Sequence, residues 1–148
     1  YLGKGDQSYW NELHRRLNNG PLRGRWTYHG EIDRTAKIAY LQSLTVMSTP
    51  TIYRESKGLP TIEAWAAGTP VVLPNHGAFP EMVNATGGGL LHEPLDVVDL
   101  ADKLGLLLSD VRLASDLGDA GRRAAETLFN APQMATETLA LYERLVGG

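Results

Sequence analysis

The chain has 148 residues, 43% of them hydrophobic, which fits one globular domain that can bury its own core. It contains no cysteine, which excludes a disulfide framework, a thiolate metal site and a cysteine nucleophile, and fits a cytoplasmic location. A formal net charge of −3 argues against nucleic acid as a partner, and no apolar run approaches the ~20 residues of a transmembrane helix.

The first residues look like the end of an element. Tyr1, Leu2 and Gly3 are typical of the last residues of a strand, and turn residues follow at Lys4 and Gly5. We therefore expect a fragment of a longer protein. The alternative is a natural terminus that has lost its initiator methionine.

Apolar periodicity in the first half of the chain predicts alternating helices and short strands. A helix is expected over residues 8–18, and a second one after Asp33, which can cap it. Strands are expected over residues 26–29 and 44–48, and a polar loop follows over residues 49–59.

The second half continues this alternation. A helix from Pro60 to about residue 67 precedes strands over residues 71–73 and 90–92. Three more helices are predicted: one opened by Pro94 and Asp96, one with apolar positions between residues 113 and 128, and one started by Asn130 and Pro132. We expect residues 110–148 to form the C-terminal helices of the domain.

Short apolar strands separated by helices indicate an α/β fold, with a Rossmann-like, doubly wound parallel sheet that is buried on both faces. Such sheets bind ligands outside the carboxyl ends of their strands. The loops expected there are residues 3–6, 30–33, 49–59 and 74–80. Because fold alone does not give function, a bare scaffold without an active site is the alternative.

Residues 55–63 join a predicted strand to a predicted helix and carry the most chemical information. Gly58 permits a close backbone approach or a positive φ, and Pro60 suits the first helical turn. The first N–H groups of a helix have no partner within it and lie at its positive end, so they bind anions such as phosphate. Here these donors are Leu59, Thr61 and Ile62, and Thr61 could add its hydroxyl.

Two carboxylates flank this anion site: Glu55 in the loop before the helix, and Glu63 about one turn inside it. Carboxylates accept hydrogen bonds from hydroxyls and stabilise developing positive charge, so a nucleotide sugar would match the segment. Arg54 and Lys57 could balance the charge of its diphosphate. Taken singly, Glu63 could merely favour the helix dipole, and Glu55 could be a solvated loop charge.

The segment resembles the donor-site signature of retaining GT-B glycosyltransferases (glycosyl transferases group 1), in the group of glycogen synthases and phosphatidylinositol mannosyltransferases. The resemblance rests on Glu55, seven residues and Glu63, with Gly58-Leu59-Pro60 inside and Ala-Trp-Ala-Ala-Gly-Thr-Pro-Val-Val after them. It continues through a turn over residues 77–83, the run Gly87-Gly88-Gly89-Leu90-Leu91, and the upstream loop Gly30-Glu31-Ile32. In all it covers about residues 1–108.

This resemblance implies a nucleotide-sugar-binding domain, the C-terminal half of a GT-B enzyme that transfers a hexosyl group with retention of configuration. Glu55 would be the catalytic contact to the sugar hydroxyls near the anomeric carbon, and Glu63 would hold the ribose hydroxyls. Backbone N–H groups around Gly58, Leu59 and Thr61 would face the diphosphate or the sugar. The other donor-binding candidates are Lys57 and Pro60, with Gly30, Glu31 and Ile32 bordering the base.

The resemblance further implies that no metal or other cofactor is needed, because the helix dipole and basic side chains take its place. The implied partners are the nucleotide-sugar donor and an N-terminal acceptor domain absent from this chain. Peripheral membrane association of the longer protein is left open.

Two features depart from the family pattern. Ser56 and Lys57 stand where the family usually has an aromatic or small pair. The resemblance implies that the Arg and Lys of the family's donor site, and the first strand and helix of its domain, would lie before Tyr1. We therefore expect residues 1–148 to be inactive alone.

Two other functions stay open. Nucleotide-sugar epimerases and sugar-phosphate synthases share the fold, and a non-catalytic module that binds nucleotide sugars would keep the same scaffold. The sequence does not specify the donor sugar, the base or the acceptor.

Overall fold

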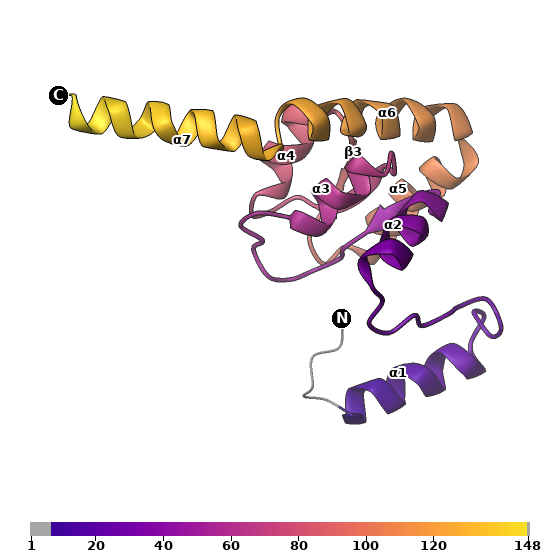
Figure 1. Cartoon of the computed structure of the whole chain (residues 1–148). Coiled ribbons are helices and arrows are strands. Elements are labelled where there is room, and N and C mark those ends of the chain that lie inside the picture. The colour runs from indigo at the N-terminus through magenta and orange to yellow at the C-terminus, as the bar shows by residue number, and fades with distance from the viewer. Residues whose placement is uncertain (1–6, 148) are drawn as a thin grey trace. The chain divides into compact units, whose positions relative to one another are not determined.

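The computed structural model describes residues 7–147. The chain forms two compact units, Tyr1–Ala36 and Lys37–Gly148. The second unit contains the sheet and most of the helices (Figure 1). The strand end predicted at residues 1–3 lies outside the described residues.

In the first unit, helix α1 (Gln7–Asn19) confirms the first predicted helix. The rings of Trp10 and His14 on α1 contact those of Tyr28 and Trp26, with centroid distances of 4.5 and 5.0 Å. The strand predicted over residues 26–29 is wrong, because this segment joins no sheet among the described residues. Its alternating aromatic side chains contact the helix instead of a neighbouring strand.

The second unit is built on a three-stranded parallel sheet, in the order β1 (Met47–Ser48), β2 (Val71–Pro74) and β3 (Gly89–His92). Val71 pairs with Met47 on one side and with Gly89 on the other. All four residues of β2 are buried, as expected for a strand covered on both faces. The predicted α/β fold is therefore confirmed, although β1 is shorter than the predicted strand over residues 44–48.

Two crossover helices, α3 (Leu59–Ala66) and α4 (Phe79–Thr86), pack on one face of the sheet. Trp65 of α3 and Phe79 of α4 are buried there against Leu73 of β2. The helix α3 confirms the helix predicted from Pro60, and its start lies directly after the loop that follows β1.

Where the sequence predicted a turn over residues 77–83, the structure forms helix α4. Phe79, Met82 and Val83 are all buried. Because they lie three and four positions apart, they share one helical face, and burial of that face stabilises a helix that turn composition alone does not indicate.

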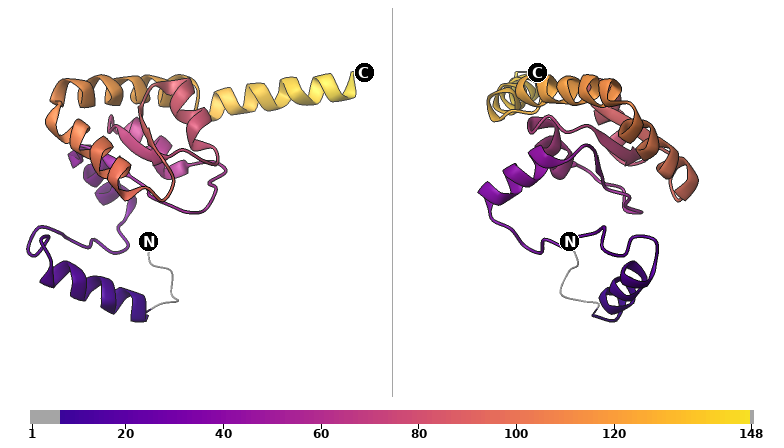
Figure 2. Two further views of the ribbon diagram at one scale, coloured as in Figure 1. Left: turned by 180° about the vertical axis from the view of Figure 1, so that it is seen from behind. Right: turned by 90° about the vertical axis from the view of Figure 1, so that its right-hand side faces the viewer.

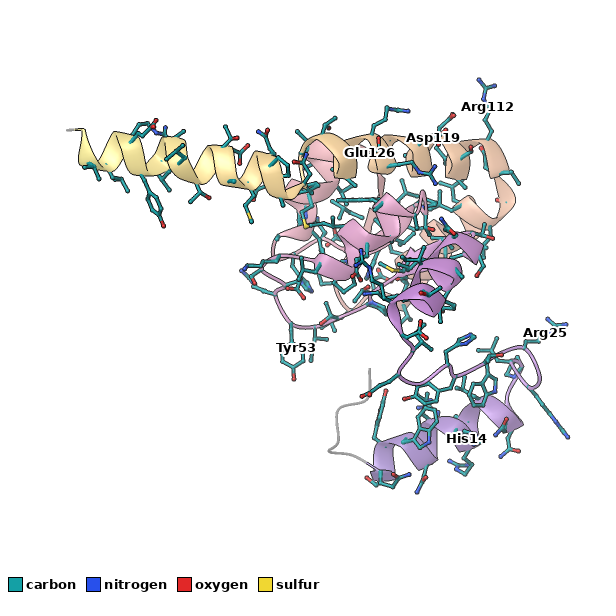
Figure 3. The ribbon with its side chains drawn as sticks, in the orientation of Figure 1. His14, Arg25, Tyr53, Arg112, Asp119 and Glu126 are labelled. Atoms are coloured by element: carbon teal, nitrogen blue, oxygen red, sulfur yellow. The ribbon has the colours of Figure 1, made fainter. Side chains whose placement is uncertain are left out.

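Helices α5 (Val97–Ser109) and α6 (Val111–Thr127) contribute to a second core cluster, in which Leu107 and Ala114 pack with Val72 of β2. Successive residues of a strand point to opposite faces, so Val72 lies on the face opposite Leu73. Along α6, exposed polar side chains point to solvent (Figure 3); those labelled are Arg112, Asp119 and Glu126.

Helices α2 (Arg34–Ser43) and α7 (Ala131–Val146) begin at the predicted caps. Asp33 accepts a hydrogen bond from the Ala36 N–H at 2.8 Å, and Asn130 accepts one from the Gln133 N–H at 2.8 Å. Helix α7 runs on from the end of α6 and buries none of its residues (Figure 2). In residues 7–147, no helix combines the length and apolar character needed to span a bilayer.

Candidate functional site

The loop that follows β1 meets the loop that follows β2 at the carboxyl edge of the sheet. The Ala78 N–H donates to the Glu55 carbonyl at 2.8 Å, and His76 Nε2 lies 2.9 Å from the Thr51 carbonyl oxygen. Gly77 has a φ of +61°, and a Cβ there would lie 2.8 Å from the Glu55 nitrogen. The two loops together therefore hold the backbone of Glu55, the predicted catalytic residue.

Gly58 precedes α3 in the left-handed conformation, with φ +57° and ψ +39°. A Cβ at this position would lie 2.9 Å from Met82 Sδ and 3.3 Å from Phe79 Cε1. The positive φ favours glycine at this position, and a larger residue would also require the Met82 side chain to shift.

The start of α3 offers fewer free donors than predicted. The N–H groups of Thr61 and Ile62 both donate to the Gly58 carbonyl, at 2.9 and 3.2 Å. The Thr61 residue is only 1% exposed, so its hydroxyl lies in the core and not at the surface. The prediction that these groups are open to an anion is corrected, because Gly58 is the N-cap of α3 and its carbonyl accepts the first hydrogen bonds of the helix. Leu59 begins the helix, so its N–H has no acceptor within it.

The Glu55 side chain folds back onto its own loop. Its Oε1 accepts hydrogen bonds from the N–H groups of Ser56, at 2.9 Å, and Lys57, at 3.3 Å. The backbone N–H groups of Lys57, then Ser56, then Gly58 lower the pKa of the Glu55 carboxyl from its ordinary value of 4.5. Glu55 is thus ionised at neutral pH, so it accepts hydrogen bonds and stabilises positive charge but has no proton to donate.

We expect a carbon-13 NMR titration of the Glu55 carboxyl to give a pKa below 4.5. A carboxyl whose pKa is lower in the folded state stabilises the fold above its unfolded-state pKa, and this stability is lost as the pH falls through its folded-state pKa. The stability difference between wild type and Glu55→Gln should therefore be constant above ~pH 6 and change only below ~pH 4.5, where wild type loses its advantage. A titration midpoint above 4.5 would contradict the hydrogen bonds to this carboxylate.

Glu63 lies in the second turn of α3, and its Oε1 is 2.6 Å from Lys37 Nζ on α2. The side chains are 45% and 42% exposed. The sequence analysis did not identify Lys37, which precedes Glu63 by 26 residues and carries no motif of its own. Only the packing of α2 beside α3 reveals this partner.

Other predicted donor-site residues of the second unit lie at the surface. Lys57, Leu59 and Pro60 are exposed next to the buried Gly58. The same loop carries Tyr53, which is 80% exposed and points outward (Figure 3). This edge of the sheet therefore presents an ionised carboxylate, a cation and the positive end of a helix to solvent.

Gly30, Glu31 and Ile32 belong to the first unit, so their place beside a nucleotide base stays a prediction. Arg54 is exposed in the loop before Glu55. Within residues 7–147, no group of three or more His, Asp or Glu side chains is placed to hold a metal ion.

Comparison with known proteins adds to this geometry. The family model described as glycosyl transferases group 1 matches residues 3–124. The MMP α-(1→4)-mannosyltransferase of Mycolicibacterium hassiacum is 41% identical over 109 residues, which are 73% of this chain and 26% of that protein. The phosphatidyl-myo-inositol mannosyltransferase of Mycobacterium leprae is 32% identical over 142 residues, 96% of this chain and 36% of that protein. The chain thus spans roughly a quarter to a third of these relatives.

Solved structures share the fold. Sucrose-phosphate synthase from Thermosynechococcus elongatus superposes with a TM-score of 0.80 at 32% identity, over 93% of this chain and 34% of that one. HepE from Anabaena gives a TM-score of 0.82 at 23% identity, over 93% of this chain and 38% of that one, a likeness of fold alone.

Proposed function

This chain belongs to the glycosyl transferases group 1 family, and on that basis we propose that it binds the nucleotide-sugar donor in a retaining GT-B glycosyltransferase. The reaction is transfer of a hexosyl group from a nucleotide-diphosphate sugar to an acceptor. The names of two relatives describe mannosyl transfer, which supports a hexose as the transferred group.

One observation carries the proposal: the two carboxylates, Glu55 and Glu63, flank the start of α3 at the carboxyl edge of a parallel sheet. The diphosphate would lie between them, at the Leu59 N–H and the positive end of the helix. Lys57 and Arg54 would supply countercharge from the exposed loop. Glu63 would then accept hydrogen bonds from the ribose hydroxyls.

Glu55 is proposed to act at the sugar end of the donor. When the bond to the diphosphate breaks, positive charge develops at the anomeric carbon. The Glu55 carboxylate, kept ionised by backbone N–H groups, would stabilise that charge, while α3 and the basic side chains stabilise the departing diphosphate. These groups supply the stabilisation without a metal, so we propose a metal-independent reaction.

Acceptor binding is assigned to parts of the protein outside residues 1–148, because the relatives are about three to four times as long as their match to this chain. We accordingly propose that residues 1–148 do not turn over alone and that the full-length protein acts in the cytoplasm.

The test is isothermal titration calorimetry of the full-length protein with UDP, GDP and ADP, in the presence of EDTA. We expect one of them to bind, and Glu63→Gln to weaken its binding about 10–100-fold, because a hydrogen bond to a charged group is lost. Glu126→Gln, on the solvent side of α6, is the matched control and should bind like wild type. If no nucleotide binds, or if Glu63→Gln has no effect, the donor-site assignment fails.

Product analysis separates the alternative enzymes. A transferase releases nucleoside diphosphate only as the acceptor is glycosylated, and proton NMR of the product should show the donor's anomeric configuration. A nucleotide-sugar isomer formed without an acceptor would favour the epimerase alternative.

A further inference from the structure

The ion pair between Lys37 and Glu63 links α2 to α3 at the proposed nucleotide site. The Nζ–Oε1 distance is 2.6 Å, and both side chains are close to half exposed. Ion pairs with this exposure contribute little to folding stability, because water screens them and two long side chains must be ordered. The pair therefore adds little to the folding free energy. Its position beside the proposed nucleotide site points instead to a role in binding.

We propose that Lys37 is a positioning residue that orients the Glu63 carboxylate for the ribose hydroxyls of the donor, an inference that rests on the proposed function. Lys37 is the hydrogen-bond partner that the described residues provide for the Glu63 carboxylate, and it engages Oε1. A carboxylate has about four acceptor positions on its two oxygens. With Lys37 on one of them, Oε2 and the second lone pair of Oε1 stay open to a vicinal diol.

The lysine aids ribose recognition in two ways. A bound ribose shields the carboxylate from water, and a retained countercharge offsets the cost of removing that water. The pair also restricts the Glu63 rotamers before the nucleotide arrives, so less side-chain entropy is lost on binding.

The fold holds Lys37 in place through the rest of α2. Leu41, one turn further along the helix, is 8% exposed and belongs to the core cluster that includes Trp65 of α3. The buried Thr69 hydroxyl, in the turn after α3, donates to the Leu41 carbonyl at 2.7 Å. Since α2 and α3 are tied at this point, the base of Lys37 is fixed relative to Glu63.

The test uses calorimetry on the full-length protein, with whichever of UDP, GDP or ADP binds and with its 2′-deoxy counterpart. In wild type we expect the ribonucleotide to bind about tenfold more tightly than the deoxynucleotide, because the deoxy form lacks one hydroxyl partner of Glu63. Lys37→Met should lower ribonucleotide affinity about fivefold to tenfold and leave deoxynucleotide affinity within about twofold, so the ribose preference collapses. In a Glu63→Gln background, Lys37→Met should have no further effect.

Two control variants test whether the effect depends on a cation at position 37 and on this particular ion pair. Lys37→Arg keeps a cation next to Glu63 and should retain most of the ribose preference. Lys103→Met removes the lysine of another, partly exposed pair, Lys103–Asp99 on α5, 3.6 Å apart, and should change neither affinity.

Two outcomes would overturn the positioning role. If Lys37→Met weakens ribonucleotide and deoxynucleotide equally, the lysine acts on the phosphates; if it weakens neither, the pair is only a surface contact. Failure of the proposed function is a separate result, since wild type would then bind none of the three nucleotides.

Discussion

Replacing Glu55 with glutamine should lower kcat of the full-length protein about 10²–10³-fold, with KM for the donor changed less than about threefold. Glutamine has nearly the same shape, and its amide oxygen can still accept from the Ser56 and Lys57 N–H groups. The loop should therefore persist, while the negative charge next to the anomeric carbon is lost. The measurement is the initial rate of nucleoside diphosphate release at several donor concentrations.

This result would depend on charge and not on folding, and two comparisons check that. Far-ultraviolet circular dichroism of Glu55→Gln should match wild type, and Glu126→Gln on α6 should keep full kcat. If Glu55→Gln turned over at the wild-type rate, Glu55 would have no catalytic role, and the chain would be better explained as a binding module.

Replacing Trp65 with alanine should lower the free energy of unfolding by about 3–5 kcal/mol, the cost of emptying a large buried site. Trp65 is fully buried, stacks on Phe129 at a centroid distance of 6.0 Å, and donates from Nε1 to the Gly88 carbonyl at 2.8 Å. Its indole fills a space in which a Cβ at Gly88 or Gly121 would overlap the ring. Urea unfolding followed by circular dichroism gives the value.

Trp65→Phe is the matched comparison for this core site. It keeps an aromatic ring but loses the Nε1 hydrogen bond and some volume, so a smaller loss of about 1–2 kcal/mol is expected. A loss below about 1 kcal/mol for the alanine variant would mean that the packing of Trp65 against Phe129 and Gly121 does not support this core.

Local patterns explain why much of the second unit could be predicted. Asp33 and Asn130 act through hydrogen bonds to residues three positions away, so their caps are readable without tertiary information. The apolar run of β2 likewise reports burial on both faces. The prediction of a strand over residues 26–29 was wrong because a strand depends on a paired neighbour, which local sequence does not show. In the structure the Trp26 ring contacts His14 on α1 instead.

Some features of the candidate site can likewise be read from local sequence, and others depend on how the helices pack. Residue order is enough to show which carboxylates flank a helix start and that glycine precedes it, because residues 55–63 are consecutive and their chemistry is local. The hydrogen bond from the Thr61 N–H to the Gly58 carbonyl is likewise local to the first turn of α3. Two other contacts appear only in the packed structure: the close approach of α4 to Gly58, and the ion pair of Lys37 with Glu63. These contacts depend on backbone conformation and on helix packing across 20 or more residues of chain, and residue type and spacing do not encode such distances.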